Sequence, residues 1–196
     1  MDIRALHTQA LALVTELVDQ VKEDQLALPT PCADWDLRTL LGHMIGQNYG
    51  FAAAAEGRGE DGEAWRDRTF EGAPAQAWAA SAAELGAAFA ATAGPFRIPE
   101  IREGVDIPAD MAISFHFIDT LVHGWDLAAA LGLPFEPPAE LAQVGLVVAE
   151  QVPAGPEFRG PGRAFSEVLE LEEEQPAAFH RTLALLGRDR NWTAAA

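Results

Sequence analysis

The chain has 196 residues, of which 49% are hydrophobic, and its 13 basic and 30 acidic side chains give a formal net charge of −17. This length fits one domain with a small appendage, and the apolar fraction is too high for a disordered protein. The acidic balance makes nucleic acid and anionic membranes poor partners, so we interpret most of the charge as a solubilising coat.

The sequence has no uninterrupted apolar stretch of the roughly 18 residues that a membrane span needs. Its N-terminal segment does not show the pattern of a signal peptide. The single cysteine, Cys32, excludes an internal disulfide, which is typical of a reducing compartment. We therefore expect a cytoplasmic protein.

Apolar periodicity predicts helices and almost no strand. Asp34 is the expected N-cap of the second helix, because its carboxylate can accept the free N–H groups of the first turn. Pro74 suits the start of the third helix, and Gly132 with Pro134 ends the fourth. The expected helices cover residues of about 3–23, 35–56, 74–92, 108–131, 139–152 and 176–187, with a loop at 57–72 and an irregular crossover at 94–108.

Four long helices with a long crossover predict an all-α four-helix bundle followed by short C-terminal helices. Bundles of this kind place metal sites on facing helices in their interior. We expect residues 1–152 to form a metal-binding bundle and residues 153–196 to form a C-terminal extension that packs on it.

The predicted fourth helix carries four titratable side chains in one narrow stripe. At about 100° per residue, His116, Asp119, His123 and Asp126 fall within an arc of about 80°, and the rest of the circumference is largely apolar. An exposed helix would instead show a broad polar face. We therefore expect this helix to be buried nearly all round, with the stripe facing an internal cavity.

A divalent metal would explain how such a stripe can be buried. A lone buried charge is costly unless it is paired or coordinated. Asp119 and His123 are four residues apart, so they share a helix face and can bind one ion. His43, at the edge of the apolar face of the second helix, is the candidate third ligand. The alternatives are a surface ion pair for Asp119 and His123 and a core histidine for His43.

The other polar candidates have less specific patterns. His116 is a fourth ligand or, as we favour, a residue that lines the cavity. Asp126 either orients an imidazole through its second ring nitrogen or forms an ion pair on the helix face. Cys32, close to a helix N-terminus, is a reactive thiol, a soft ligand or, as we favour, a small buried residue. We interpret His7 and His180 as structural.

Several segments together resemble the DinB-like superfamily, and within it the branch related to mycothiol-dependent maleylpyruvate isomerases. The likeness covers nearly the whole chain, and HGWDLA after an acidic residue is its most specific part. The segments are TPCADW at 30–35, LLGH at 40–43, DTLVHGWDLA at 119–128 and the closing LALLGRD at 183–189.

The resemblance implies a four-helix bundle that holds a divalent metal, usually zinc, through His43, Asp119 and His123. It also implies that the metal binds the sulfur of a low-molecular-weight thiol such as mycothiol. This chain departs from the isomerase in having Asp119 where that enzyme has glutamate, and in being too short for its second domain. The functional arginine of the isomerase has no clear counterpart here, and the candidates are Arg66, Arg68 and Arg102.

Three protein ligands leave a coordination position open, which is typical of catalytic zinc. Together with the thiol chemistry that the resemblance implies, this open position leads us to expect a metal-dependent thiol transferase or isomerase that acts on a small electrophile. His116 is the expected proton shuttle, because an ordinary histidine has a pKa near 6.5. Zinc is the first candidate metal, with nickel, iron and manganese as alternatives, and a homodimer is one candidate assembly. The alternative functions are metal-assisted hydrolysis and metal or ligand binding without turnover.

Overall fold

The protein is described by a computed structural model that covers residues 2–32, 35–153, 155, 158–160, 165–171 and 174–194. Within this part of the chain about half of the residues are helical and nearly all of the regular secondary structure is helix, which confirms the predicted all-α class. The helices are α1 (Ile3–Val18), α2 (Leu37–Ala55), α3 (Ala75–Ala91), α4 (Ala109–Leu131), α5 (Ala139–Ala149) and α6 (Ala178–Leu185), and a short 3₁₀ turn spans Glu23–Gln25.

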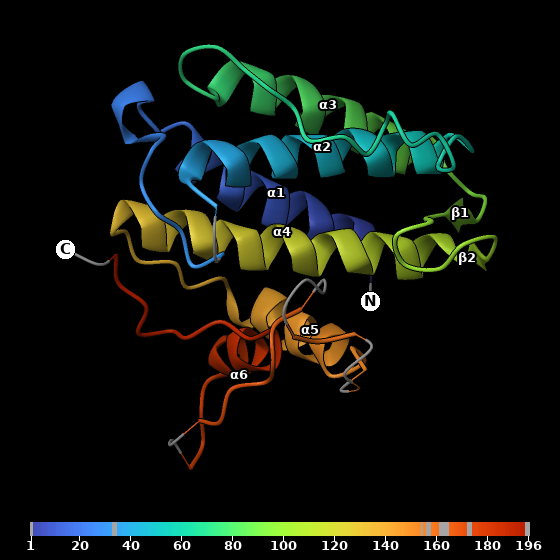
Figure 1. The fold of residues 1–196 in the computed structure, drawn as a ribbon. Helices are drawn as coiled ribbons and strands as arrows, with labels where there is room; N and C mark the ends of the chain where they lie inside the picture. Colours follow the sequence, from blue (N-terminus) through green and yellow to red (C-terminus); the bar gives the residue numbers. More distant parts are fainter. Residues whose placement is uncertain are drawn as a thin grey trace.

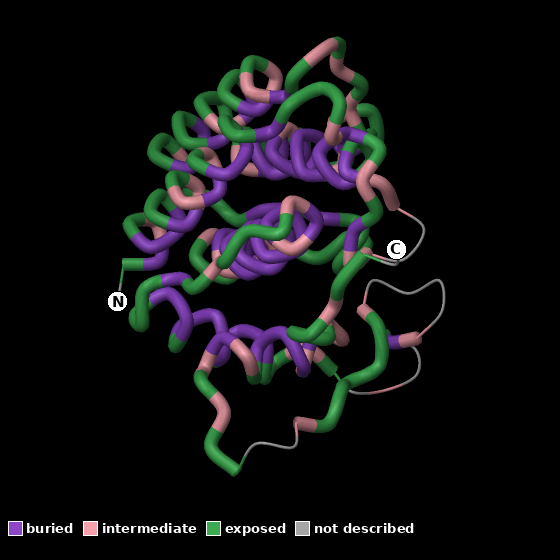
Figure 2. Tube along the Cα trace, turned by 90° about the vertical axis from the view of Figure 1, so that its left-hand side faces the viewer, coloured by how far each residue is buried: buried purple, intermediate pink, exposed green. Residues whose placement is uncertain are grey.

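Helices α1 to α4 form a four-helix bundle (Figure 1). Both α1 and α2 pack against α3 and against α4, so the order around the bundle is α1, α3, α2, α4. The inner sides of these helices are buried and the outer sides are exposed (Figure 2). Helix α5 packs on α4 and on α6. The two helices α5 and α6 therefore lie together on the α4 side of the bundle.

The crossover between α3 and α4 contains a small hairpin that was not predicted from the sequence. Strands β1 (Phe96–Arg97) and β2 (Asp106–Ile107) pair in antiparallel fashion, with Phe96 opposite Ile107. These two apolar side chains are buried in the core. On the exposed side, Arg97 and Asp106 form an ion pair of 2.8 Å. A two-residue strand lies below the length at which alternation in a sequence can be recognised.

Several helix ends differ from the sequence-based prediction, among them the end of the fifth helix, which stops at Ala149 rather than near residue 152. The first helix ends at Val18 rather than near residue 23, and the chain then forms the 3₁₀ turn. The second helix begins at Leu37, and its N-cap is Asp36, whose carboxylate accepts a hydrogen bond of 2.8 Å from the Thr39 N–H. The predicted cap, Asp34, lies outside the described residues.

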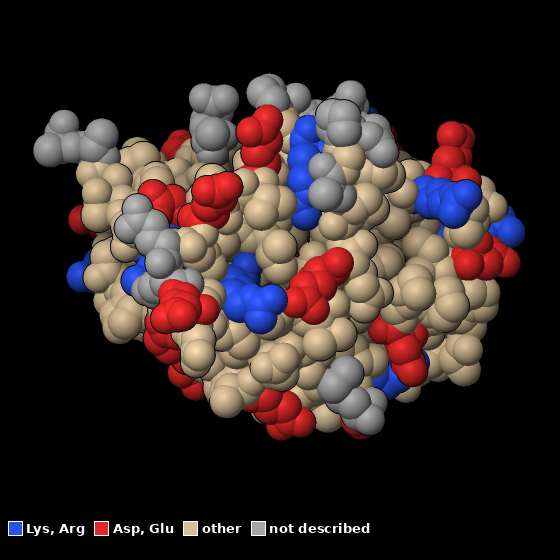
Figure 3. All heavy atoms as spheres, turned by 90° about the horizontal axis from the view of Figure 1, so that it is seen from below, with Lys and Arg blue, Asp and Glu red and all other residues tan. Residues whose placement is uncertain are grey.

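Figure 3 shows the face of the molecule that α5 and α6 form. Acidic and basic side chains are scattered over this face and do not gather in one patch. In the part of the chain that the structure describes, no helix combines the length and the apolar character needed to cross a bilayer.

Candidate metal centre

Helix α4 is buried along most of its length, as its apolar circumference predicts. His116, His123 and Asp126 are all buried, and Asp119 is partly open to solvent. The titratable stripe does not face one cavity, however. Asp119 and His123 face α2, Asp126 faces the segment before α2, and His116 is turned toward α1.

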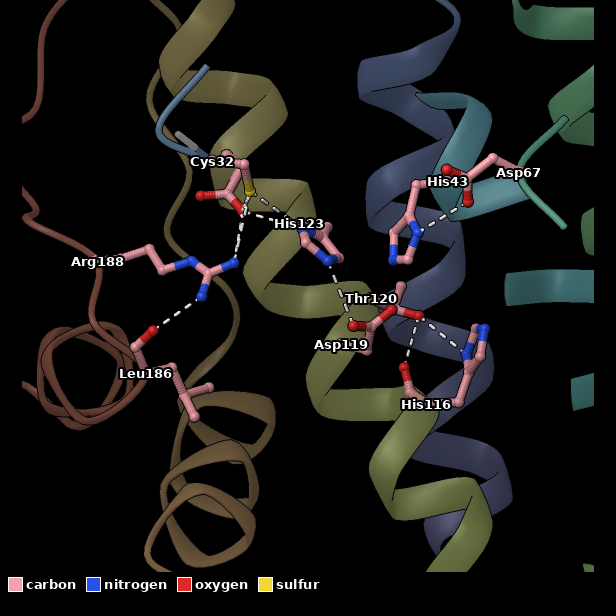
Figure 4. Close-up of polar contacts among 10 residues, drawn as sticks. Cys32, His43, Asp67, His116, Asp119, Thr120, His123, Leu186 and Arg188 are labelled. Carbon is pink, nitrogen blue, oxygen red and sulfur yellow. Dashed lines mark hydrogen bonds and ion pairs between the residues drawn. The ribbon is translucent and has the colours of Figure 1, made fainter. Parts of the chain in front are cut away.

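The structure brings His43 of α2 together with Asp119 and His123 of α4 (Figure 4). One possible ligand atom from each of the three lies within 4.8 Å of the other two. His123 Nε2 is 3.4 Å from Asp119 Oδ1, and the two imidazole rings are 5.5 Å apart and nearly perpendicular. The Asp119 side chain retains 36% of its exposure, so the group is accessible from solvent on that side.

Each histidine of the group is oriented by a carboxylate on its other ring nitrogen. His123 Nδ1 is 2.9 Å from Asp126 Oδ2, and His43 Nδ1 is 3.1 Å from Asp67 Oδ1. The predicted contact of Asp126 with an imidazole is thus present. With Nδ1–H donated to a carboxylate, the Nε2 lone pair of each ring is left for a metal, which is the arrangement that metal-binding histidines commonly show. Two imidazoles and one carboxylate form a donor set that suits zinc.

A stripe of glycines on α2 explains how Asp67 reaches His43. The loop at residues 65–68 lies directly on Gly42, Gly46 and Gly50 of α2, which are spaced four residues apart on one helix face. A Cβ atom on Gly42 would stand 2.5 Å from a loop carbonyl oxygen, and one on Gly46 would stand 2.6 Å from another. The Arg68 N–H also donates to the Gly42 carbonyl over 2.9 Å. This loop was predicted only as a polar connection.

Trp35 lies against both imidazoles of the candidate centre. Its ring is 4.8 Å from that of His43 and 6.3 Å from that of His123. The indole thus shields one side of the histidine pair from water, while the side near Asp119 stays open.

The charges of the site are arranged so that its carboxylates stay ionised. Burial would raise the pKa of Asp119, but the neighbouring His123 and His43 lower it below its usual range. Burial would likewise lower the pKa of His123, but Asp119, Asp126 and Cys32 raise it well above the ordinary value. In the protein without metal, a proton on His123 therefore balances its acidic neighbours, and a bound cation would take over that role.

Behind His123 lies a second group of polar side chains, formed by Cys32, Asp126 and Arg188. The Cys32 thiol donates to Asp126 Oδ2 over 3.0 Å and lies 3.8 Å from His123 Nδ1. Arg188 Nη2 is 3.3 Å from the same Asp126 oxygen. Burial alone would raise the pKa of Asp126, but Arg188 and His123 lower it. Cys32 is thus half-buried and hydrogen-bonded rather than a simple space-filling residue.

His116 does not belong to the donor group. Its Nδ1 lies 2.9 Å from His7 Nε2 and 3.1 Å from the Thr120 hydroxyl. The ring also packs against Phe51 and Phe89. His7, for which the sequence showed no partner, is therefore one half of a buried histidine pair. Burial lowers the pKa of His116 to about 4 rather than leaving it near 6.5, and the proposed role as a proton shuttle stays a prediction.

Of the arginines, the sequence-based candidates are not those that the structure places at the centre. Arg66 pairs with Glu63 on the surface, Arg68 packs on the Tyr49 ring, and Arg102 is exposed. Arg188 reaches the site instead. It stands in the closing LALLGRD segment, which was noted for its resemblance but not for this residue.

The structure also has a pocket of about 770 Å³ at the C-terminal end of α4, away from the candidate centre. Its walls include Trp125, Phe135 and Trp192, and none of the three candidate ligands lines it.

A family model described as the mycothiol maleylpyruvate isomerase N-terminal domain matches residues 7–128, which include all three candidate ligands. Two uncharacterized proteins of Mycobacterium tuberculosis, from strains CDC 1551 and H37Rv, are each 35% identical to the chain over 188 residues, covering 96% of this chain and 98% of theirs. No solved structure matches the chain.

Proposed function

The chain belongs to the mycothiol maleylpyruvate isomerase N-terminal domain family, and we propose that it is a metal-dependent enzyme that transfers or uses a low-molecular-weight thiol. In this proposal His43, Asp119 and His123 hold one divalent cation, with zinc as the first candidate. The observation that carries the proposal is the convergence of these three donors, with a carboxylate behind each imidazole.

Three protein ligands are typical of a catalytic rather than a structural zinc, because they leave room for a further ligand. A cation bound here would favour the thiolate form of an incoming thiol near neutral pH. The chain itself supplies the orientation of the two imidazoles and the shielding by Trp35. The partly exposed Asp119 marks the side from which the thiol and a small electrophile reach the site.

Isomerisation of maleylpyruvate is not part of this proposal. The resemblance implies a glutamate in the isomerase at the position of Asp119, and the aspartate side chain is shorter by one methylene group. Arg188, the arginine that reaches the centre, is bound to Asp126 on the Nδ1 side of His123, whereas Asp119 lies on the Nε2 side. In this proposal the low-molecular-weight thiol is the substrate that the chain shares with the isomerase, and the second substrate is a small electrophile.

Metal content is the first test of the proposal. Purified wild-type protein is compared by elemental analysis with His43→Ala and His123→Ala. His180→Ala is the control, because His180 is a partly exposed histidine that pairs with Glu136 in another part of the molecule. We expect the two site variants to stay folded and lose the metal, and the control to keep it. Metal retained by both site variants would overturn the proposed centre.

Thiol binding is the second test. Calorimetry with mycothiol should show binding to the metal-loaded protein and none to the metal-free protein, and S-methylated mycothiol should not bind. Mass spectrometry after addition of an electrophile then follows the conjugate. Product that accumulates beyond one equivalent per chain supports an enzyme, whereas thiol that is retained without product indicates a binding protein. A metal-loaded protein without affinity for mycothiol or related thiols would contradict the thiol chemistry.

A further inference from the structure

A second possible metal-binding group lies on the opposite side of His123. Cys32, His123 and Asp126 each offer a ligand atom, and these atoms lie within 4.8 Å of one another. The sulfur is 3.0 Å from Asp126 Oδ2 and 3.8 Å from His123 Nδ1, and Nδ1 is 2.9 Å from the same oxygen. A thiolate, an imidazole and a carboxylate form a set that binds zinc at least as readily as the group that includes His43.

This second group already has a cation beside it. Arg188 Nη2 is 3.3 Å from Asp126 Oδ2 and 3.5 Å from the Cys32 sulfur. The Arg188 side chain retains 13% of its exposure and that of Asp126 retains none, so water screens their interaction weakly. An arginine stays charged at every pH that a protein tolerates. Its charge therefore repels a divalent ion from the side of His123 that carries Nδ1.

The end of α6 holds Arg188 in this position. Gly187 adopts φ 75°, and the N–H groups of Gly187 and Arg188 donate to the carbonyls of Ala184 and Leu183. These two bonds form a Schellman motif, which ends the helix and fixes the direction of the next residue. The Arg188 Nη1 then donates to the Leu186 carbonyl over 2.8 Å. The guanidinium is thus held by the backbone of its own turn.

We propose that Arg188 is a positioning residue that determines which side of His123 takes the metal, by standing in for a cation between Cys32 and Asp126. This inference rests on the proposed function. It keeps Asp126 as the hydrogen-bond partner of Nδ1, so that Nε2 is left for the metal beside His43 and Asp119. It also keeps the chain's own thiol from becoming a ligand, so that the open coordination position is left for an external thiol.

Cobalt(II) spectroscopy tests this inference without any activity measurement, because cobalt bound to a thiolate shows an intense sulfur-to-metal charge-transfer band. Metal-free wild type, Arg188→Met, Arg188→Lys and the double variant Arg188→Met/Cys32→Ser are each titrated with Co²⁺. Methionine keeps most of the length of arginine and removes the charge, whereas lysine keeps the charge. Arg188→Gln serves in place of Arg188→Met if the latter does not fold.

We expect no charge-transfer band in wild type or in Arg188→Lys. The band should appear in Arg188→Met, at least tenfold stronger than the wild-type background, and disappear again in the double variant. A band in wild type, or a folded, cobalt-binding Arg188→Met protein without one, would overturn the role of Arg188. Failure of the proposed function gives a different result. In that case wild type either binds no cobalt or binds cobalt that His43→Ala does not remove, whatever Arg188→Met shows.

Discussion

His123 has a carboxylate on each side of its ring. Asp126 binds Nδ1 at 2.9 Å and Asp119 lies 3.4 Å from Nε2. Only Asp119 faces His43. Asp119 is therefore the candidate ligand, and Asp126 is the partner that orients the ring. His43 repeats the pattern with Asp67, although that carboxylate is 56% exposed. The two imidazoles therefore differ in how firmly they are held.

The first prediction concerns these two orienting carboxylates. Asp126→Asn should weaken zinc binding by about tenfold to a hundredfold, which is the usual loss when the partner of a metal-bound histidine is removed. It should also lower the free energy of unfolding by a few kcal/mol, because Arg188 then stays buried without its ionic partner. Asp67→Asn is the matched control, because it removes the exposed carboxylate that orients His43. It should reduce the zinc affinity and the free energy of unfolding by less than Asp126→Asn does. Competition with a chromophoric chelator measures the affinity, and a folded Asp126→Asn protein with wild-type affinity would contradict this.

The second prediction concerns the buried pair of His7 and His116. Burial and His116 lower the pKa of His7, and burial lowers that of His116 to about 4, whereas unfolded histidines titrate near 6.5. The unfolded chain therefore takes up protons first as the pH falls. The contribution of the pair to stability is fully present above about pH 6.5 and is lost as the pH falls toward 4, and His116 accounts for up to about 3 kcal/mol of it.

Urea unfolding of the metal-free protein between pH 7 and 4.5 measures this loss. His116→Asn cannot be protonated in this range and still places a polar atom close to the position of Nδ1. The variant should be less stable than wild type at pH 7, and the difference should shrink as the pH falls. A difference that is independent of pH would show that the pair does not titrate as its burial requires.

At the scale of elements, the face of α2 that consists of glycines determines where the loop at residues 65–68 lies. Gly42, Gly46 and Gly50 leave room for its backbone and for the Trp65 ring, and this contact brings Asp67 to His43. The site thus depends on a helix face that carries no ligand. The polar, glycine-bearing sequence of the loop indicates a connection but not the surface on which it rests.

The third prediction tests this contact. Gly46→Ala should lower the free energy of unfolding by about 1–3 kcal/mol, because its Cβ would stand 2.6 Å from the Arg66 carbonyl oxygen. It should also weaken zinc binding, since the loop that carries Asp67 must move. Gly86→Ala on α3 is the matched control, because its Cβ would meet nothing within 4 Å, and it should be stabilising by about 0.5–1 kcal/mol. Chemical unfolding and chelator competition measure both effects, and equal behaviour of the two variants would refute the packing argument.

At the scale of the whole molecule, the bundle and the approach of α2 to α4 could be predicted from the sequence. The apolar circumference of α4 and its stripe of His116, Asp119, His123 and Asp126 indicated burial. The position of His43 on its helix, and then the family resemblance, pointed to it as the partner of Asp119 and His123. These features follow from local periodicity and from short motifs, which a single sequence displays directly. The all-α class followed from the same periodicity.

The partners that surround the three candidate ligands could not be predicted in this way. Asp67 and Arg188 come from a loop and from the turn after α6, and His7 meets His116 across 109 positions of sequence. Such contacts depend on how elements pack and leave no periodic signal in the chain. A titratable stripe on one helix therefore predicted that polar groups are buried, but it did not predict that they divide among three separate environments.

X-ray absorption spectroscopy of the zinc-loaded wild-type protein, without added thiol, tests most directly whether α2 and α4 share one ion. The structure predicts zinc bound by two imidazole nitrogens and a carboxylate oxygen at about 2.0–2.2 Å, with no sulfur near about 2.3 Å. His43→Ala should remove the scattering of one imidazole or abolish binding. A zinc ion with a sulfur ligand, or with an imidazole contribution that His43→Ala leaves unchanged, would contradict the account.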